Sequence, residues 1–584
     1  MEFTLITDLE NANLKTNKKY IYVGVVNLDE YERLNLNKNI ILGTQFNLNK
    51  NNKKNQRIKN LEYCEQLHKK ILTSLTNELN KTHNENYDKK FWNRVIGRWL
   101  KEFLYISYFN FITIENLLNK KKFTNIIIPK FEKIDFHTKN YSHFVRSYLS
   151  KNWISKLNSL IIQFLNPKIP VEVILTKKNY FYTKNKIKKK IDIKYLLNQL
   201  LLMINFFFKK KKKIFFYQTG LPFFYEKYIQ LKLSKKFTFW EMPKLDYFSN
   251  SYNSEKRNKL LLNFTISNSF EKFLKMNLKY FLPLFLIENF TNIKNSILNS
   301  ALPKNIDLIL TGTGFNDEIF NVYNALQSSR NTKFICLQHG NCYNTHYMND
   351  YLYEFKNSDY FFTWGRKKKN NQYAIYNFNV IFRRKLVKAS GNLSIICNSL
   401  SSRAVPFETY SINEKNFNHA LDFAESLDIN IRKKTFFRLL HWEEDNSNEI
   451  LKKKILSKKL KFYNHDISYK KILSTSRLNI FNFDSGGFLE NMLLDIPSII
   501  FNKYIFKNLR DECVYDYEKL VKANLIFLDI NSLKKHVNRI WANPLEWWND
   551  KLTKDAINKF NIKYNRSYKN KLIMLPKIIG NLQN

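Results

Sequence analysis

The stretch from residue 479 to 501 carries the residues best suited to bind a phosphate. A short apolar run is followed by Ser485, Gly486 and Gly487, at the start of a predicted helix that carries Glu490. Glycines let a ligand approach the backbone closely, and the first N–H groups of a helix attract anions. Glu490 lies about one turn further along, where its carboxylate could bind a sugar hydroxyl. A capped strand–turn–helix without any ligand is the alternative interpretation.

Two further groups of polar residues follow apolar runs that are typical of buried strands. They are Thr313, Gly314 and Asn316 after the run 306–311, and Gln338, His339 and Gly340 after the run 333–337. Ligands of open parallel sheets bind at the carboxyl ends of the strands. Both groups are therefore predicted to face a binding site.

His339 is the candidate general base. An unperturbed imidazole has a pKa of about 6.5, which suits proton removal from a hydroxyl group. A structural histidine bonded to loop carbonyls is the alternative, and Asp317 and His441 are further candidates for the base. Arg438, in the run 435–440, could bind a phosphate in fork geometry.

A helical segment from about residue 87 to 118 carries two arginines among aromatic residues. Arg94 and Arg98 flank Gly97, and Trp92 and Trp99 lie beside them. The glycine predicts close packing against another element. The arginines could contact an anion, or they could be solvated residues of a core helix.

The charge of the chain is strongly positive. Its 584 residues include 96 Lys and Arg against 50 Asp and Glu, a formal net charge of +46. This excess indicates a nucleic-acid or membrane-surface partner. However, Lys, Asn, Ile, Phe and Tyr are enriched throughout, as an AT-rich genome would produce, and no nucleic-acid-binding module is recognisable. We therefore expect no nucleic-acid partner.

The cysteines and apolar segments indicate a cytoplasmic protein. Five cysteines show neither paired nor metal-ligand spacing, which is typical of a reducing compartment. The N-terminus lacks a secretory signal. The segments Leu196–Phe208 and Phe281–Ile287 are shorter than the roughly 20 apolar residues that a membrane span needs. The basic surface could still hold the protein on anionic lipid of the inner membrane.

Apolar runs alternate with helical patterns along the chain, which predicts an α/β fold with parallel sheets. We predict an α/β domain with helical insertions over residues 1–385 and a Rossmann-like domain over 386–545. A helical tail over 546–584 would pack back on the first domain. Two doubly wound domains with facing strand ends would enclose a cleft.

Four short blocks, in one order, carry a resemblance to a known family. They are Asn86-Tyr87 with Phe91-Trp92, Arg94, Gly97 and Trp99-Leu100; Gln338-His339-Gly340; Ser358-Asp359 with Thr363-Trp364-Gly365; and Asp484-Ser485 with Glu490 and Pro497. Nearly the whole chain resembles the transferase family found in bacterial lipopolysaccharide O-antigen gene clusters. More distantly, the second and fourth blocks resemble GT-B enzymes, including polyol-phosphate polymerases of wall teichoic acid synthesis and nucleotide-sugar 2-epimerases.

Two positions depart from the family pattern. The family continues the second block with further glycines and an aromatic residue, whereas this chain has Asn341, Cys342 and Tyr343. The family also has hydroxyl residues after the serine of the fourth block, where Gly486 and Gly487 stand here. The second departure leaves phosphate binding to backbone amides.

The resemblance implies a GT-B-like fold with an N-terminal helical elaboration, and a glycosyltransferase of cell-surface polysaccharide synthesis. The C-terminal domain would bind a nucleotide-sugar donor through Arg438, Ser485, Gly486, Gly487 and Glu490. The N-terminal domain would bind a glycan or lipid-linked acceptor, with His339 as base and with Thr313, Gly314, Asn316, Gln338, Gly340, Arg94 and Arg98 on the acceptor side. No cofactor is expected. Metal-independent transfer is expected, because metal ligands do not cluster in the sequence and GT-B enzymes usually need none.

Two alternatives stay open. The first is another activity of the same architecture, either a polyol-phosphate transferase or a nucleotide-sugar epimerase, and an epimerase needs no acceptor. The second is a non-enzymatic basic protein that binds polyanions, whose affinity would fall steeply with salt.

Overall fold

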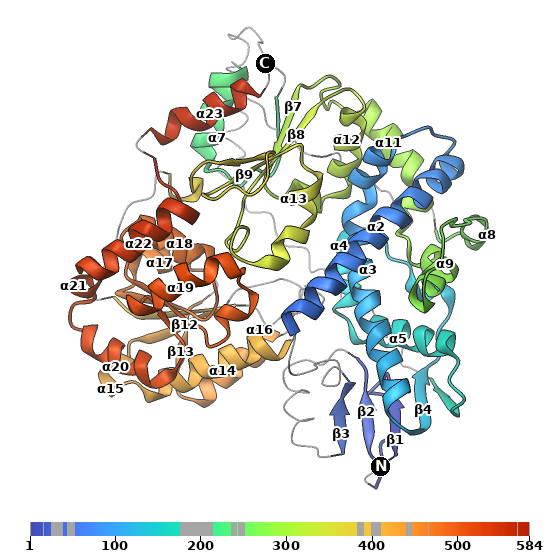
Figure 1. Cartoon of the computed structure of the whole chain (residues 1–584), viewed down its shortest axis with the longest axis horizontal. Coiled ribbons are helices and arrows are strands. Elements are labelled where there is room, and N and C mark those ends of the chain that lie inside the picture. Colours follow the sequence, from blue (N-terminus) through green and yellow to red (C-terminus); the bar gives the residue numbers. More distant parts are fainter. Residues whose placement is uncertain are drawn as a thin grey trace.

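The protein is built around three parallel β-sheets with helices packed around them, in the computed structural model shown in Figure 1. The structure describes residues 2–15, 17–24, 39–43, 53–175, 214–234, 242, 251–381, 391–398, 410–439, 447–464, 466–568 and 570–582. Every ladder between the named strands is parallel. The predicted α/β fold with parallel sheets is therefore confirmed.

The first sheet has the strand order β3-β2-β1-β4-β5. Its strands are β1 (Phe3–Ile6), β2 (Tyr20–Tyr22), β3 (Ile40–Leu42), β4 (Phe123–Pro129) and β5 (Val171–Ile174). The order reverses after β3, as in a doubly wound sheet. Its main helices are α2 (Lys53–His83), α3 (Lys89–Lys120), α4 (Tyr141–Tyr148) and α5 (Lys151–Leu165). The N-terminal elaboration that we expected to be helical thus also contains a sheet.

The second sheet adds its strands in sequence order, from β6 to β10. They are β6 (Ile214–Phe216), β7 (Leu308–Thr311), β8 (Lys333–Leu337), β9 (Tyr360–Thr363) and β10 (Gln372–Ala374). Between β6 and β7 lie α7 (Phe223–Ser234), α8 (Ser254–Asn258), α9 (Ser269–Phe281), α10 (Leu284–Ile287) and α11 (Phe290–Asn299). Two helices follow, α12 (Glu318–Ser328) after β7 and α13 (Tyr353–Asn357) before β9, and the long helix α3 packs on both.

The third sheet has the order β13-β12-β11-β14-β15-β16, which is the strand order of a Rossmann fold. Its strands are β11 (Leu393–Cys397), β12 (Thr435–Leu439), β13 (Lys461–Phe462), β14 (Leu478–Phe481), β15 (Ser498–Phe501) and β16 (Ile526–Phe527). Its helices are α14 (Tyr410–Ser426), α15 (Ile429–Arg432), α16 (Ser447–Ser457), α17 (Tyr469–Thr475), α18 (Gly486–Leu493), α19 (Asp511–Lys522) and α20 (Ile530–Ile540). The order reverses between β11 and β14, and ligands of such sheets bind at this switch point.

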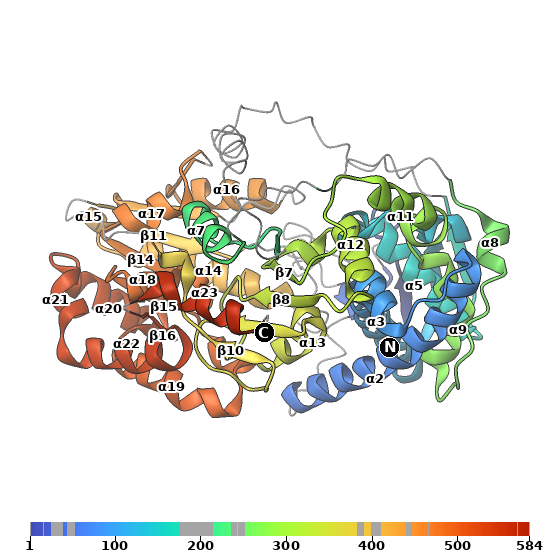
Figure 2. The same cartoon turned by 90° about the horizontal axis from the view of Figure 1, so that it is seen from above.

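The C-terminal helices contact both of the last two sheets. They are α21 (Pro544–Asn549), α22 (Lys551–Tyr564) and α23 (Lys571–Asn581). Helix α22 packs on α18 and α19, whereas α23 packs on α7, beside the second sheet (Figures 1 and 2). Between them, the Arg566 N–H donates to the Trp364 carbonyl at 2.7 Å.

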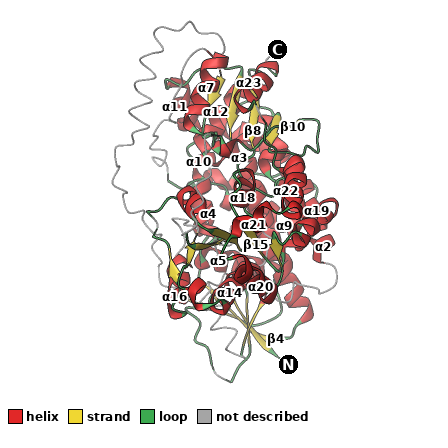
Figure 3. Cartoon of the chain, turned by 90° about the vertical axis from the view of Figure 1, so that its left-hand side faces the viewer, coloured by secondary structure: helices red, strands yellow, loops and turns green. Residues whose placement is uncertain are grey.

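The second sheet lies between two apolar cores, and its strands contribute to both. In β7, Leu308 and Leu310 belong to the core shared with the third sheet, whereas Ile309 belongs to the core shared with α3 and the first sheet. Successive side chains of a strand point to opposite faces, which explains the division. Helices cover the strands of this sheet on both faces, as Figure 3 shows.

Some predictions fall outside the described residues. They concern the segment Leu196–Phe208, the base candidate His441 and the domain boundary at residue 385. Within the described parts of the chain, no helix is both long and apolar enough to cross a membrane.

Candidate functional site

Helix α18 begins at the predicted turn, at the carboxyl edge of the third sheet. Ser485 caps the helix, since its Oγ accepts a hydrogen bond from the Gly487 N–H at 3.1 Å. The turn follows β14, one of the two strands at the switch point. The N-terminal end of the helix dipole therefore lies where an α/β sheet binds its ligand.

The two glycines of this turn have different surroundings. A Cβ on Gly487 would lie 2.4 Å from the Tyr469 hydroxyl, so α17 covers this residue, and Ser485 uses its N–H. A Cβ on Gly486 would meet no atom closer than the Asn341 nitrogen at 3.7 Å. Gly487 is therefore required for packing, and its N–H is already bonded to Ser485. Of the two glycine amides that we expected to bind phosphate, the one of Gly486 remains available.

Arg438 lies near Tyr469, the residue of α17 that covers Gly487. It is half-buried on β12, and its Nε and Nη1 atoms are buried without a hydrogen-bond partner among the described residues. Burial lowers the pKa of Arg438, and the adjacent Tyr469 partly offsets this effect. Since a desolvated cationic group needs a partner, the arrangement favours an anion beside Arg438.

Glu490 lies in the second turn of α18. Its Oε1 accepts a hydrogen bond from the Asn379 Nδ2 at 3.1 Å. Asn379 belongs to the short helix η6 (Phe378–Val380), which follows the second sheet. Glu490 therefore connects the third sheet to the segment that follows the second sheet. Its role in donor binding remains a prediction.

The loop after β7 packs on the loop after β6. The Thr313 N–H donates to the Gln218 carbonyl at 3.0 Å, and the Gly314 N–H donates to Thr311 Oγ1 at 2.7 Å. A Cβ on Gly314 would lie 2.6 Å from the same Oγ1, so this glycine is required for packing. Asn316 is exposed and Thr313 half-exposed, and they are the predicted acceptor residues of this loop that can reach a ligand.

Gln338 is buried and holds two loops together. Its Nε2 donates to the Gly340 carbonyl at 2.8 Å, and its Oε1 accepts from the Trp364 N–H at 2.8 Å. Gln338 thus fixes the loop after β8 beside the loop after β9, which is a positioning role. A Cβ on Gly340 would meet nothing within 4 Å, so this backbone segment borders open space.

His339 is exposed at the end of β8 and lies at one end of a polar chain. The Tyr343 hydroxyl lies 2.9 Å from His339 Nδ1 and donates to Glu354 Oε1 at 2.8 Å. His339 Nε2 lies 3.2 Å from the same hydroxyl. Because this hydroxyl has one hydrogen, the ring nitrogen that carries a proton donates to it. Although part of the side chain is exposed, the protein packed against the ring lowers the pKa of His339. Glu354 and a hydrogen bond to the Gly312 backbone partly offset this decrease, and Arg98 adds to it. A neutral imidazole can act as a general base.

The two arginines of α3 have different positions. The Arg98 guanidinium stacks on Tyr141 and Phe315, at 4.6 and 4.8 Å from their ring centroids. It therefore lies beside the loop after β7, close enough to His339 to affect its pKa. Arg94 is only 2% exposed and binds Asp359 and Asn324. Its expected place on the acceptor side is therefore wrong: the guanidinium joins α3 to the second sheet.

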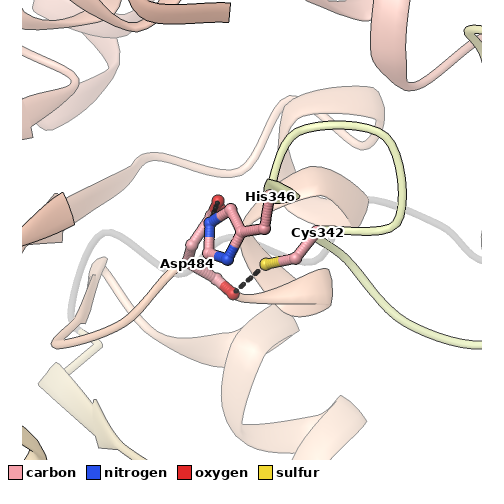
Figure 4. A group of neighbouring side chains, drawn as sticks. All are labelled: Cys342, His346 and Asp484. Carbon is pink, nitrogen blue, oxygen red and sulfur yellow. Dashed lines mark hydrogen bonds and ion pairs between the residues drawn. The ribbon is translucent and has the colours of Figure 1, made fainter. Parts of the chain in front are cut away.

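Asp484 joins the loop after β8 to the third sheet. Its carboxylate accepts hydrogen bonds from Asn341 Nδ2 and from the Tyr517 hydroxyl, both at 2.5 Å. His346 Nε2 lies 3.2 Å from the same carboxylate, and the Cys342 thiol lies 3.6 Å from the Asp484 carbonyl (Figure 4). The carboxyl ends of the second and third sheets therefore meet through Asp484.

Sequence reasoning did not identify several residues at this junction as functional. They are Asn341, Cys342, Tyr343, His346, Glu354, Asp484 and Tyr517. Cys342 and His346 are four residues apart, but Asp484 is far away in the sequence. The expectation that metal ligands do not cluster is wrong here, because these three side chains come together.

In many α/β proteins, phosphate-containing ligands bind at a helix start beside the switch point of a parallel sheet. The chain belongs to the LIC12162 family of transferases, whose family model matches residues 3–579. The predicted resemblance to a transferase family is thereby confirmed, and the protein is a transferase. A comparison with curated proteins gives no match.

Solved structures show a low overall likeness. A Listeria monocytogenes protein assigned as UDP-N-acetylglucosamine 2-epimerase has 12% identity and a TM-score of 0.34, over 64% of this chain and 96% of that one. Anabaena HepE, solved with UDP and glucose, has 11% identity and a TM-score of 0.33, over 64% and 98%. WaaG, a glycosyltransferase of lipopolysaccharide biosynthesis, has 11% identity and a TM-score of 0.27, over 51% and 95%. These scores are too low to support a function.

Proposed function

We propose that this transferase is a glycosyltransferase of cell-surface polysaccharide synthesis, such as that of O-antigen. It would move a sugar from a nucleotide-activated donor to a hydroxyl group of a glycan or lipid-linked acceptor. Residues 386–545 would form the donor side and residues 1–385 the acceptor side. We place the protein in the cytoplasm, where its net charge of +46 would favour contact with anionic lipid of the inner membrane.

The unpaired guanidinium of Arg438 is the observation that supports this proposal most directly. Two of its nitrogens are buried without partners in the described structure, and the Gly486 N–H lies at the start of α18, where an added Cβ would meet no atom closer than 3.7 Å. A diphosphate would satisfy both groups through charge-assisted hydrogen bonds. The same two groups would stabilise the negative charge that develops on the departing nucleotide, so the reacting centre would need no metal ion.

On the acceptor side, His339 would take the proton of the attacking hydroxyl on the ring nitrogen that carries no hydrogen. The hydrogen bond to the Tyr343 hydroxyl would orient the ring, and the lowered pKa of His339 favours a neutral imidazole near pH 7. The oxygen of the acceptor would then form the new bond to the anomeric carbon as the bond to the nucleotide breaks. Arg98 and Asn316 would line the acceptor side.

Thermal stabilisation by a panel of nucleotides and nucleotide sugars tests donor binding. A ligand at a hundredfold excess over its Kd stabilises the folded state by about 2.7 kcal/mol. Arg438→Met removes a charged hydrogen-bond donor worth about 1.5–3 kcal/mol, so binding should weaken roughly 10- to 100-fold. Lys434→Met is the matched control, because it removes the same charge from an exposed position just before β12.

The result also separates the alternatives. Equal shifts in the wild type, Arg438→Met and Lys434→Met would contradict the proposed donor site. Conversion of a nucleotide sugar without an acceptor would indicate an epimerase, and turnover of a nucleotide-activated polyol would indicate a polyol-phosphate transferase. No nucleotide shift, with tight and salt-sensitive binding to polyanions, would favour the non-enzymatic alternative.

A further inference from the structure

Three side chains with different metal-binding atoms converge at the junction between the second and third sheets. They are the Cys342 thiol, the His346 imidazole and the Asp484 carboxylate, and their ligand atoms all lie within 4.8 Å of one another. Figure 4 shows the three side chains directed toward one another, two from the loop after β8 and one from the turn before α18. The Asp484 side chain is 5% exposed and that of His346 is 17% exposed.

The contact between His346 and Asp484 has the distance of an ion pair but not the geometry of a hydrogen bond. Nε2 lies 3.2 Å from Oδ2, yet Nε2 has no hydrogen-bond partner in the described structure. Two ligands of one tetrahedral ion also approach each other without a hydrogen bond, because both point at the ion. With metal–ligand bonds of about 2.0 Å, that separation is about 3.3 Å.

We propose that Cys342, His346 and Asp484 bind one zinc ion. The sugar transfer proposed above does not require this ion. A thiolate, an imidazole and a carboxylate form a ligand set typical of zinc, whereas magnesium and calcium take oxygen ligands. Three protein ligands leave a fourth position, which water would occupy.

Neighbouring groups orient the ligands as surrounding residues do in zinc proteins. Asn341 Nδ2 donates to one oxygen of Asp484 and the Tyr517 hydroxyl donates to the other, which leaves each oxygen a further lone pair. The loop with Cys342 and His346 is itself fixed, because the His346 N–H donates to the Cys342 carbonyl at 3.0 Å and the Arg510 N–H donates to the Thr345 carbonyl at 2.9 Å.

The ion would join the loop that carries His339 to the turn that carries Gly486. Cys342 and His346 follow His339 by three and seven residues, and Asp484 precedes Gly486 by two. Zinc would therefore hold the proposed base and the proposed phosphate contact in a fixed relation, as a structural link across the junction. Loss of zinc should loosen this link without unfolding either sheet.

Metal analysis of the full-length protein tests the proposal. The wild type is incubated with one equivalent of zinc, passed through a desalting column and analysed by plasma mass spectrometry. We expect about one zinc per chain in the wild type. For Cys342→Ser and His346→Ala we expect the affinity for zinc to be at least about 100-fold lower. Such a loss exceeds the one caused by changing a residue that only bonds to a metal ligand. Cys513→Ala is the matched control, since this nearby thiol is buried and bonds the Asn344 carbonyl instead.

Cobalt substitution gives a second readout that needs no variant. If cobalt replaces zinc in the wild type, a thiolate ligand produces an intense sulfur-to-cobalt absorption band. This measurement uses the wild type alone, so it does not depend on whether the variants fold. Substoichiometric zinc after desalting, absence of that band, or a full zinc equivalent in folded Cys342→Ser would overturn the proposal. Nucleotide binding is not part of this assay, so its outcome is independent of the donor site.

Discussion

Replacing Asp359 by asparagine should destabilise the protein much more than removing one of its two cationic partners. Asp359 binds Arg94 at 3.0 Å and Lys90 at 2.9 Å. The Arg94 side chain is 1% exposed, whereas that of Lys90 is 54% exposed. Asparagine would still accept the hydrogen bond from the Phe334 N–H, but it would leave a buried guanidinium without a counter-charge.

The magnitude follows from the burial of each partner. Breaking a buried ion pair by removing one member costs about 3–5 kcal/mol, whereas an exposed pair contributes about 0–1 kcal/mol. Because the Asp359 side chain is 23% exposed, water partly screens the pair. We therefore expect a loss of about 3 kcal/mol for Asp359→Asn and at most about 0.5 kcal/mol for Lys90→Ala.

The effect should depend on pH with a defined sign. Burial alone would raise the pKa of Asp359, but Arg94, Lys90 and the Phe334 N–H outweigh burial and lower the pKa below its usual range. A carboxylate with a lowered pKa in the folded state stabilises the protein at neutral pH, and this contribution is lost as the pH falls below about 4. The difference between the wild type and Asp359→Asn should therefore narrow in acid.

Thermal unfolding of the wild type, Asp359→Asn and Lys90→Ala tests this reasoning. In a domain of 150–250 residues, each kcal/mol shifts the midpoint by about 2–4 °C, so Asp359→Asn should lower it by roughly 6–12 °C. Equal shifts in the two variants, or an unchanged midpoint in Asp359→Asn, would refute the assignment of Arg94 as a buried structural cation.

Two further predictions concern packing and acid stability. Gly365→Ala should destabilise the protein by about 1–3 kcal/mol, because a Cβ there would lie 2.5 Å from the Tyr564 carbonyl carbon; Gly340→Ala, with nothing within 4 Å, should leave the melting temperature unchanged. Burial raises the pKa of Glu65, but Lys101 at 2.5 Å and a second lysine lower it to about 2. The wild type should therefore lose more stability between about pH 4.5 and 2 than Glu65→Gln does, as acid denaturation of the two proteins would show; parallel acid profiles would contradict the ion pair.

The sequence by itself determined the strands and their class. Short apolar runs such as 306–311 and 333–337 predicted buried parallel strands, and they are observed as β7 and β8. The helix start at Gly486 was also predictable, because a serine before two glycines is a local capping signal. These features depend on neighbouring residues in the chain, so the pattern is enough to find them.

Only the tertiary structure decided which strands share a sheet and which side chains meet. The first sheet is additional to the two sheets that we expected. It depends on the pairing of β1 with β4, which joins residues over a hundred positions apart in the chain. Arg94 and Arg98 carry the same charge and lie one turn apart on α3. The Arg94 guanidinium nevertheless forms an ion pair with Asp359, whereas Arg98 lies near His339. Cys342 and His346 meet Asp484 because two sheets bring their carboxyl ends together, and such long-range contacts leave no periodic signal in a sequence.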